Sequence, residues 1–131
     1  MQHHMTIQNA EGKLRIPDKQ VGCFDLFTGV LSCMESRAIE DDGSPEVVLP
    51  VMNIPMKCYE AVIRYVAYAG PTRHHTMDLL LTQEEAEIVS KLESPLDLCR
   101  FIKAAQYLGN DACIAFATKV LLRKIAISML P

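Results

Sequence analysis

Hydrophobic and polar positions alternate on both sides of a short turn near the start of the chain. Residues 5–9 and 13–17 alternate around a Glu-Gly pair, which predicts a β-hairpin. Ile7, Leu14 and Ile16 fall on the face that this hairpin would bury. The chain is therefore expected to open with two antiparallel strands.

The apolar spacing changes to intervals of three and four residues from Phe24 onward, which is typical of a helix. The first helix is expected over residues 24–34. The acidic stretch at residues 40–45 has the composition of a loop. A third, short strand is expected at residues 47–49, where Val-Val-Leu precedes a proline.

A second helix follows this strand. Asn53 is its expected N-cap, and a Gly-Pro pair ends it. Within it, Glu60 and Arg64 have the i,i+4 spacing of an ion pair. A connector with two adjacent histidines is expected at residues 71–81, where a solvated loop is a better interpretation than a metal site.

Three further helices start at recognisable caps. Thr82 and Glu85 have the spacing of a capping box, and so do Ser94 and Asp97. The helix that Ser94 starts should end near residue 108, and Asn110 should cap a last helix to about residue 128. This order of elements predicts an α+β fold in which a short three-stranded sheet packs on a helical cluster.

Length and composition suit one domain with a real core. The chain has 131 residues, of which 50% are hydrophobic and 22% charged. We assign residues 6–131 to this domain and residues 1–5, with His3 and His4, to a tag remnant or a disordered N-terminus. The 13 basic and 16 acidic residues give a net charge of −3, which disfavours nucleic-acid binding. No apolar run reaches the roughly 20 residues of a membrane span, so we expect no membrane partner.

Residue types suited to catalysis or metal binding are not grouped into motifs. Five cysteines occur without a C-x-x-C pair. Four of them lie in apolar helical patterns and are expected to be small buried hydrophobes: Cys33, Cys58, Cys99 and Cys113. No glycine-rich phosphate loop, H-E-x-x-H or G-x-S-x-G occurs. We therefore expect a non-catalytic protein without cofactor or metal.

The last two helices are more apolar than a small domain needs. Residues 95–108 have few polar positions, and residues 110–128 carry apolar side chains on every side of the helix. Little chain follows to cover the second side. An exposed patch that marks a partner site is one interpretation, and a core helix in a well-closed domain is the other.

Several segments, in order and with similar spacing, resemble the Skp adaptor family and elongin C. Residues 98–108, Leu-Cys-Arg-Phe-Ile-Lys-Ala-Ala-Gln-Tyr-Leu, are similar to a helix of that family with an Ala-Ala-Asn-aromatic-Leu core. Residues 48–53 resemble its Leu-Pro-x-Val-x step from strand to helix, and the hairpin and the acidic loop also correspond. The resemblance implies the BTB/POZ fold and an adaptor that joins a cullin scaffold to a substrate receptor in a ubiquitin ligase.

The resemblance also implies two binding sites. Gln106 and Tyr107 match the family's cullin-contacting Asn-Tyr pair, with glutamine in place of asparagine. An apolar helix of an F-box-like receptor would lie between the last two helices. The residues implied for that groove are Phe101, Ala105, Ile114, Leu121 and Ile125, with Lys119, Arg123 and Lys124 at its rim. The two further helices with which Skp proteins clamp the F-box are not in this sequence.

Two alternatives stay open within the same fold. The protein could be an elongin-C-like subunit that binds BC-box receptors, or a self-associating BTB module. In the absence of a partner, a homodimer could cover the apolar excess. Since cullin ligases work in both compartments, the resemblance implies a location in the cytoplasm and nucleus.

Overall fold

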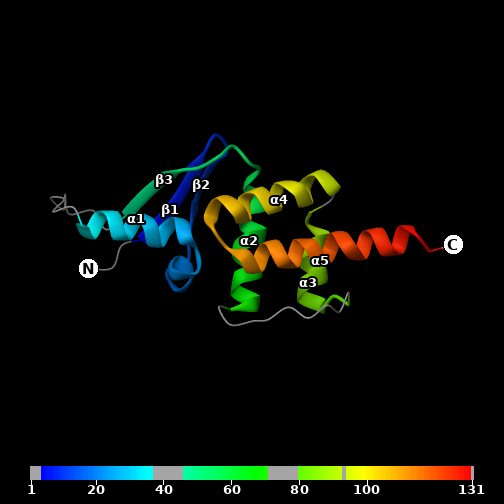
Figure 1. Ribbon diagram of the computed structural model, residues 1–131. Helices are drawn as coiled ribbons and strands as arrows, with labels where there is room; N and C mark the ends of the chain where they lie inside the picture. The colour runs from blue at the N-terminus through cyan, green and yellow to red at the C-terminus, as the bar shows by residue number, and fades with distance from the viewer. Residues whose placement is uncertain (1–3, 37–45, 71–79, 93, 131) are drawn as a thin grey trace.

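The computed structural model describes residues 4–36, 46–70, 80–92 and 94–130. Its elements follow the predicted order (Figure 1): β1 (His4–Asn9), β2 (Gly12–Arg15), the 3-10 helix η1 (Asp18–Cys23), α1 (Asp25–Ser36), β3 (Glu46–Pro50), α2 (Met56–Ala69), α3 (Gln83–Ser90), α4 (Pro95–Leu108) and α5 (Asp111–Ser128). The fold is α+β, as predicted, with the sheet and α1 towards one end of the molecule and α2–α5 towards the other. The acidic loop and most of the histidine connector lie outside the described residues.

The three strands form one mixed sheet in the order β2-β1-β3. β1 pairs antiparallel with β2, where Ile7 is opposite Leu14, and parallel with β3, where Ile7 is opposite Leu49. Met5, Ile7 and Ile16 are completely buried, and Leu14 packs half-buried against the same core. The predicted hairpin and its buried face are confirmed.

The folded chain begins earlier than the sequence indicated. β1 starts at His4, whose Nδ1 lies 3.0 Å from Oδ1 of Asp18, and Met5 is part of the core. His4 and Met5 pair with Glu46 and Val47 of β3, and the carbonyl of Met5 also accepts from the amide of Ile16 at 2.8 Å. The expectation that residues 4 and 5 lie outside the folded domain is wrong.

The start of α2 also differs from the prediction. The N-cap is Pro55, and no side chain of the cap residue bonds to the helix. Asn53 Oδ1 instead accepts a hydrogen bond from the amide of Ala10 at 2.9 Å. The amide of Met56 donates to Glu11 Oε1 at 3.0 Å. The hairpin turn, far away in sequence, therefore supplies the acceptor that Asn53 was expected to provide.

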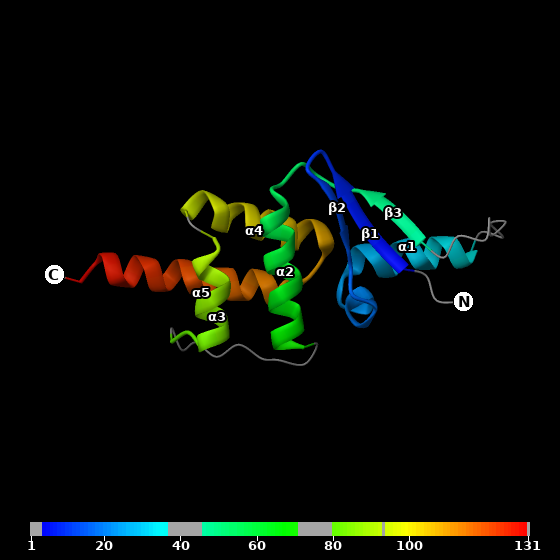
Figure 2. The same cartoon turned by 180° about the vertical axis from the view of Figure 1, so that it is seen from behind.

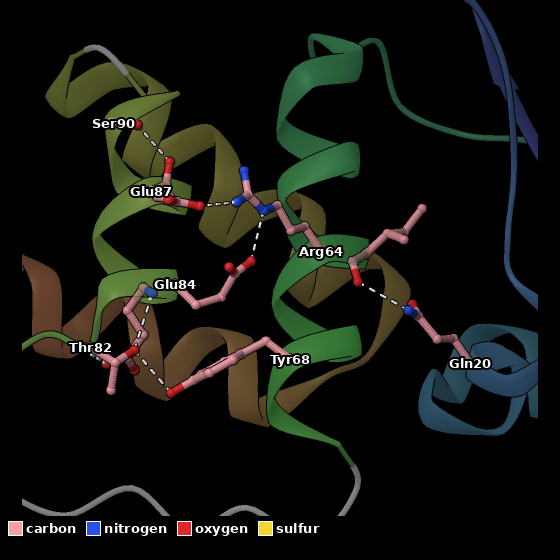
Figure 3. Close-up of polar contacts among 9 residues, drawn as sticks. Gln20, Arg64, Tyr68, Thr82, Glu84, Glu87 and Ser90 are labelled. Carbon is pink, nitrogen blue, oxygen red and sulfur yellow. Dashed lines mark hydrogen bonds and ion pairs between the residues drawn. The ribbon is translucent and has the colours of Figure 1, made fainter.

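Arg64 joins α2 to α3 (Figure 3). Its Nε donates to Glu84 Oε1 at 2.8 Å, and its Nη2 donates to Glu87 Oε2 at 2.7 Å. The expected partner, Glu60, is not the one that binds. Glu84 and Glu87 are three residues apart, so they share the face of α3 that meets α2, and one guanidinium can bind both.

The capping box predicted for α3 is present, and the start of α4 shows the Ser94 cap of its predicted box. Thr82 Oγ1 accepts from the amide of Glu85, and Glu85 Oε1 accepts from the amide of Thr82, which completes the capping box. Ser94 Oγ accepts from the amide of Asp97 at 3.1 Å. The carboxylate of Asp97 also binds Nζ of Lys57 at 2.7 Å, which holds the start of α4 against α2.

The turn between α4 and α5 admits only glycine at residue 109. Gly109 has φ +83°, and a Cβ there would lie 2.7 Å from Cβ of Asp25. The next residue, Asn110, caps α5 by accepting from the amide of Cys113, while its Nδ2 donates to the carbonyl of Cys23. This turn is therefore packed against the start of α1, which fixes the direction of α5.

The helical core lies where α2, α4 and α5 meet (Figure 2). The ring of Phe116 stacks on Tyr65 with centroids 4.3 Å apart and meets the edge of Phe101 at 6.1 Å. Cys58 and Cys113 are buried beside this cluster, as predicted. Burial raises the pKa of the Cys113 thiol to about 12, so it is a hydrophobic side chain at neutral pH.

The other two helical cysteines were predicted wrongly. Cys33 on α1 and Cys99 on α4 are exposed. In these helices apolar residues occur on more than one side, so membership in an apolar pattern does not say which side faces the core.

Candidate protein-interaction surfaces

The C-terminal end of α4 presents the residues expected to contact a cullin. Gln106 is exposed and Tyr107 is 38% exposed. Tyr59 of α2 is completely buried, and its hydroxyl donates to the carbonyl of Met52, in the segment before α2, at 2.9 Å. Burial, and then the neighbouring Tyr107, raise the pKa of Tyr59 to about 12. We name Met52, Gln106 and Tyr107 the α4-end surface; Met52 is itself 45% exposed.

Two of the residues expected in the receptor groove are not on the surface. Phe101 and Ala105 are both 0% exposed, since they lie on the side of α4 that packs against α2 and α5. Phe101 already meets the ring of Phe116. Their assignment as receptor contacts is therefore corrected, because both belong to the core of the domain. Ile102 of the same helix is half-buried.

The remaining groove residues lie on α5 and differ in exposure. Ile114 and Leu121 are half-buried against the core, whereas Ile125 is 54% exposed. The N-terminal half of α5 packs into the domain, and its C-terminal half extends beyond α2, α3 and α4 in both views (Figures 1 and 2). The large apolar residues exposed at 44% or more on or just after this half are Leu122, Ile125, Ile127, Met129 and Leu130. The predicted apolar excess of the last helix is thus on the surface.

Lys119 is not at a solvated rim as expected. Its side chain is 13% exposed, and Nζ lies 3.3 Å from Oε1 of Glu85, which is completely buried. Burial works to raise the pKa of Glu85, but the amide of Thr82 and the ammonium of Lys119 outweigh it and hold that pKa below its ordinary value. Lys119 therefore anchors α5 to α3 and cannot steer a partner.

The outward side of α5 carries a regular row of side chains that the sequence interpretation did not single out. We name this row the outer seam; its members are Ala115, Thr118, Leu122, Ile125 and Met129. All five are exposed, and they are spaced three, four, three and four residues apart. This spacing is visible in the sequence, but α5 is apolar on every side, so spacing alone does not show which row faces solvent.

The described residues include a cavity near the start of α5 but no cluster of metal-binding side chains. Within them, no group of three or more His, Cys, Asp and Glu side chains could hold a metal ion. In the same part of the chain, no helix is long and apolar enough to cross a bilayer. A cavity of about 300 Å³ near the start of α5 has Asp25 and Asp111 in its lining, each in the first turn of a helix, where a carboxylate is favourable for the helix itself.

Comparisons with known proteins add no assignment. No family model matches the sequence, and no curated protein matches it significantly. The functional conclusion therefore depends on the motifs of this chain and on the two surfaces described above.

Proposed function

We propose that the protein is a non-catalytic adaptor that links a cullin scaffold to a substrate receptor in a ubiquitin ligase of the cytoplasm and nucleus. The observation that carries the proposal is the exposure of Gln106 and Tyr107. They lie in the last turn of α4, the helix that resembles the Skp family, and they are exposed while Phe101, Ala104, Ala105 and Leu108 of the same helix are completely buried. The element order strand, strand, helix, strand, then helices also agrees with the BTB/POZ fold that the resemblance implies.

The chemistry of the α4-end surface suits a protein partner. A half-exposed tyrosine presents a rigid ring and a hydroxyl, and tyrosine is enriched among residues that dominate interface energies. Met52, whose carbonyl accepts from the Tyr59 hydroxyl, adds an exposed and adaptable apolar side chain. Gln106 keeps the amide of the family's asparagine on a longer side chain. The surface combines an apolar centre with polar atoms at its edge, as protein interfaces do.

The receptor would use the other exposed region, on α5. Ile125 is its exposed centre, with Ile114 and Leu121 at the edge that packs against the domain. A receptor helix of the F-box-like or BC-box kind would lay its apolar side along α5. Because α4 and α5 are held together in one core, an adaptor of this design would keep cullin and receptor at a fixed separation.

Titration with a cullin N-terminal fragment tests the cullin site. Tyr107→Lys should weaken binding at least a hundredfold while leaving the thermal unfolding midpoint close to that of the wild type, since the side chain is 38% exposed. Leu96→Lys is the matched control, because Leu96 is 57% exposed at the other end of the same helix. Equal affinity of the two variants would remove Tyr107 from the site. If Tyr107→Lys fails to fold, Gln106→Arg on the exposed neighbour replaces it.

A second measurement tests the receptor site separately. Hydrogen exchange of α5 should slow when an F-box or a BC-box peptide is added, and the peptide that protects it identifies the receptor class. If neither peptide protects α5, the receptor assignment is wrong, whatever the cullin result.

A further inference from the structure

The outer seam of α5 has the spacing of a two-helix packing interface. Its residues occupy the alternating three- and four-residue positions with which helices pair in coiled coils. Exposure rises along it, from 44% at Leu122 to 54% at Ile125 and 78% at Met129. The opposite side of the helix is already filled by the core, through Phe116 and Val120. The outer seam is therefore an additional helix-packing face on a helix whose first packing face is in use.

This face presents no exposed charge and no free polar group, because Lys119, four residues after Ala115 and three before Leu122, is 13% exposed and bound to Glu85. The hydroxyl of Thr118 donates to the carbonyl of Ile114 at 2.9 Å, and the hydroxyl of Ser128, beside the seam, donates to the carbonyl of Ile125 at 2.8 Å. Arg123 and Lys124 follow Leu122 by one and two residues, and such neighbours do not share a helix face. Covering the seam would thus bury no ionised group that solvent alone now stabilises, and it would leave no seam hydroxyl without its hydrogen bond.

We propose that the outer seam pairs with the outer seam of a second copy of this chain, in an antiparallel arrangement centred on Leu122. The sizes of the side chains argue for this occupant. Ala115 and Met129 are each seven residues from Leu122, on opposite sides. Antiparallel pairing therefore places the small Ala115 of one copy opposite the long Met129 of the other, twice, and Thr118 near Ile125. Small residues facing large ones fill an interface evenly.

The alternative parallel arrangement is disfavoured. It would place Ala115 against Ala115 and Met129 against Met129, so the helices would be close at one end and forced apart at the other. It would also bring the two domains together at one end of the pair. In the antiparallel pair the two domains lie at opposite ends. Ala115 and Thr118 are exposed, so the part of the seam next to the domain is also accessible to a second helix. Symmetric pairs of this kind are the commonest oligomers.

The expected dimer is weak. The seam from Ala115 to Met129 is about 21 Å long at 1.5 Å per residue. That is two heptads, which is a small contact beside the roughly 800 Å² per partner of a standard stable interface. The dissociation constant should therefore be micromolar, so that the protein exchanges between monomer and dimer as its concentration changes. A receptor helix that uses Ile125 would compete with the second copy.

Sedimentation equilibrium of the isolated protein over roughly 5 to 500 µM tests the pairing. Ile125 and Ile127 are matched for this purpose, because both are 54% exposed and lie two residues apart on different sides of α5. Ile125→Lys should raise the dissociation constant at least tenfold, and Ile127→Lys should leave it within twofold of the wild type. A wild-type monomer throughout the range, or an equal effect of the two variants, would overturn the proposal.

A charge pair tests the antiparallel register. Ala115→Glu and Met129→Lys should each weaken the dimer, and the double variant should recover it, because the introduced carboxylate then faces the introduced ammonium of the second copy at both ends. In a parallel pair the double variant would place like charges together and stay monomeric. These measurements need neither cullin nor receptor. A negative result would therefore reject the dimer without rejecting the adaptor proposal, and failure of cullin binding would leave the dimer proposal intact.

Discussion

Lys119→Met should destabilise the domain strongly, although Lys119 is on the last helix and reaches solvent. The substitution leaves Glu85 completely buried without the ammonium that now binds its Oε1. The other oxygen of this carboxylate, Oε2, has no hydrogen-bond partner in the described structure. After the substitution, the amide of Thr82 at 2.9 Å is the contact that remains to offset the cost of burying the charge.

The size of the effect follows from this geometry. Removing one partner of a buried ion pair typically costs about 3–5 kcal/mol. Lys119 is 13% exposed and its contact is 3.3 Å long, so we expect the lower end, about 3 kcal/mol. Since the free energy of unfolding of such a domain is about 5–15 kcal/mol, this loss is a large fraction of its stability. The unfolding midpoint should fall by about 10 °C.

Urea unfolding followed by circular dichroism measures the loss. Lys124→Met is the matched control, because Lys124 is exposed on the same helix, and its substitution should change the free energy of unfolding by less than about 0.5 kcal/mol. Adding Glu85→Gln to Lys119→Met removes the orphaned charge and keeps an oxygen to cap α3, so at least half of the loss should return. If Lys119→Met costs no more than Lys124→Met, the reasoning about the buried carboxylate is wrong.

Two further predictions concern pH and the α4–α5 turn. Because the pKa of Glu85 lies below its ordinary 4.5 in the folded chain, its contribution to stability is present above about pH 4.5 and is lost as the pH falls through the folded pKa. The urea midpoint should therefore drop in acid, and less steeply in Glu85→Gln. Gly109→Ala should lower the free energy of unfolding by about 2 kcal/mol or more, because φ is +83° and the new Cβ would meet Asp25. Gly29→Ala, in the middle of α1 where a Cβ meets nothing, should instead raise it by about 0.5–1 kcal/mol. Urea unfolding measures both.

Features determined by residues close in sequence were predictable. The capping box at Thr82 and the caps at Ser94 and Asn110 each depend on a hydrogen bond that spans three residues, so residue type and spacing locate them. The buried face of the hairpin was equally accessible, since strand alternation places Ile7 and Leu14 on it, although Thr6 next to Ile7 is buried as well. Both kinds of signal need no knowledge of what packs against the element.

Features determined by distant partners were not predictable. Arg64 had a plausible partner four residues earlier in Glu60, but Glu84 and Glu87 reach it together from another helix. Asn53 was a reasonable cap by type, yet Glu11 of the hairpin is the side chain that bonds to the start of α2. In each case a local rule was overruled by tertiary contacts that join segments at least 20 residues apart.

The predicted receptor groove also failed because local spacing does not determine tertiary contacts. The interpretation placed Phe101 beside Ile125 in one groove, and the structure buries the first and exposes the second. Helical spacing groups residues into rows, but in a helix that is apolar on every side it does not choose the row that faces the core. That choice is the rotation of the helix about its axis, and it decides which residues a partner can reach.

We infer that the Lys119–Glu85 pair makes this choice for α5. Lys119 follows Thr118 of the outer seam directly, so holding its ammonium on α3 turns the seam away from the domain. A buried polar pair can fix the register of an otherwise apolar contact at little gain in stability. The double variant Glu85→Gln with Lys119→Met should then regain much of its stability but lose the contrast between Ile125→Lys and Ile127→Lys in the dimer measurement, because α5 could pack in more than one rotation. If the contrast persists in that background, apolar packing around Phe116 and Val120 is sufficient to set the rotation, and the ion pair contributes stability alone.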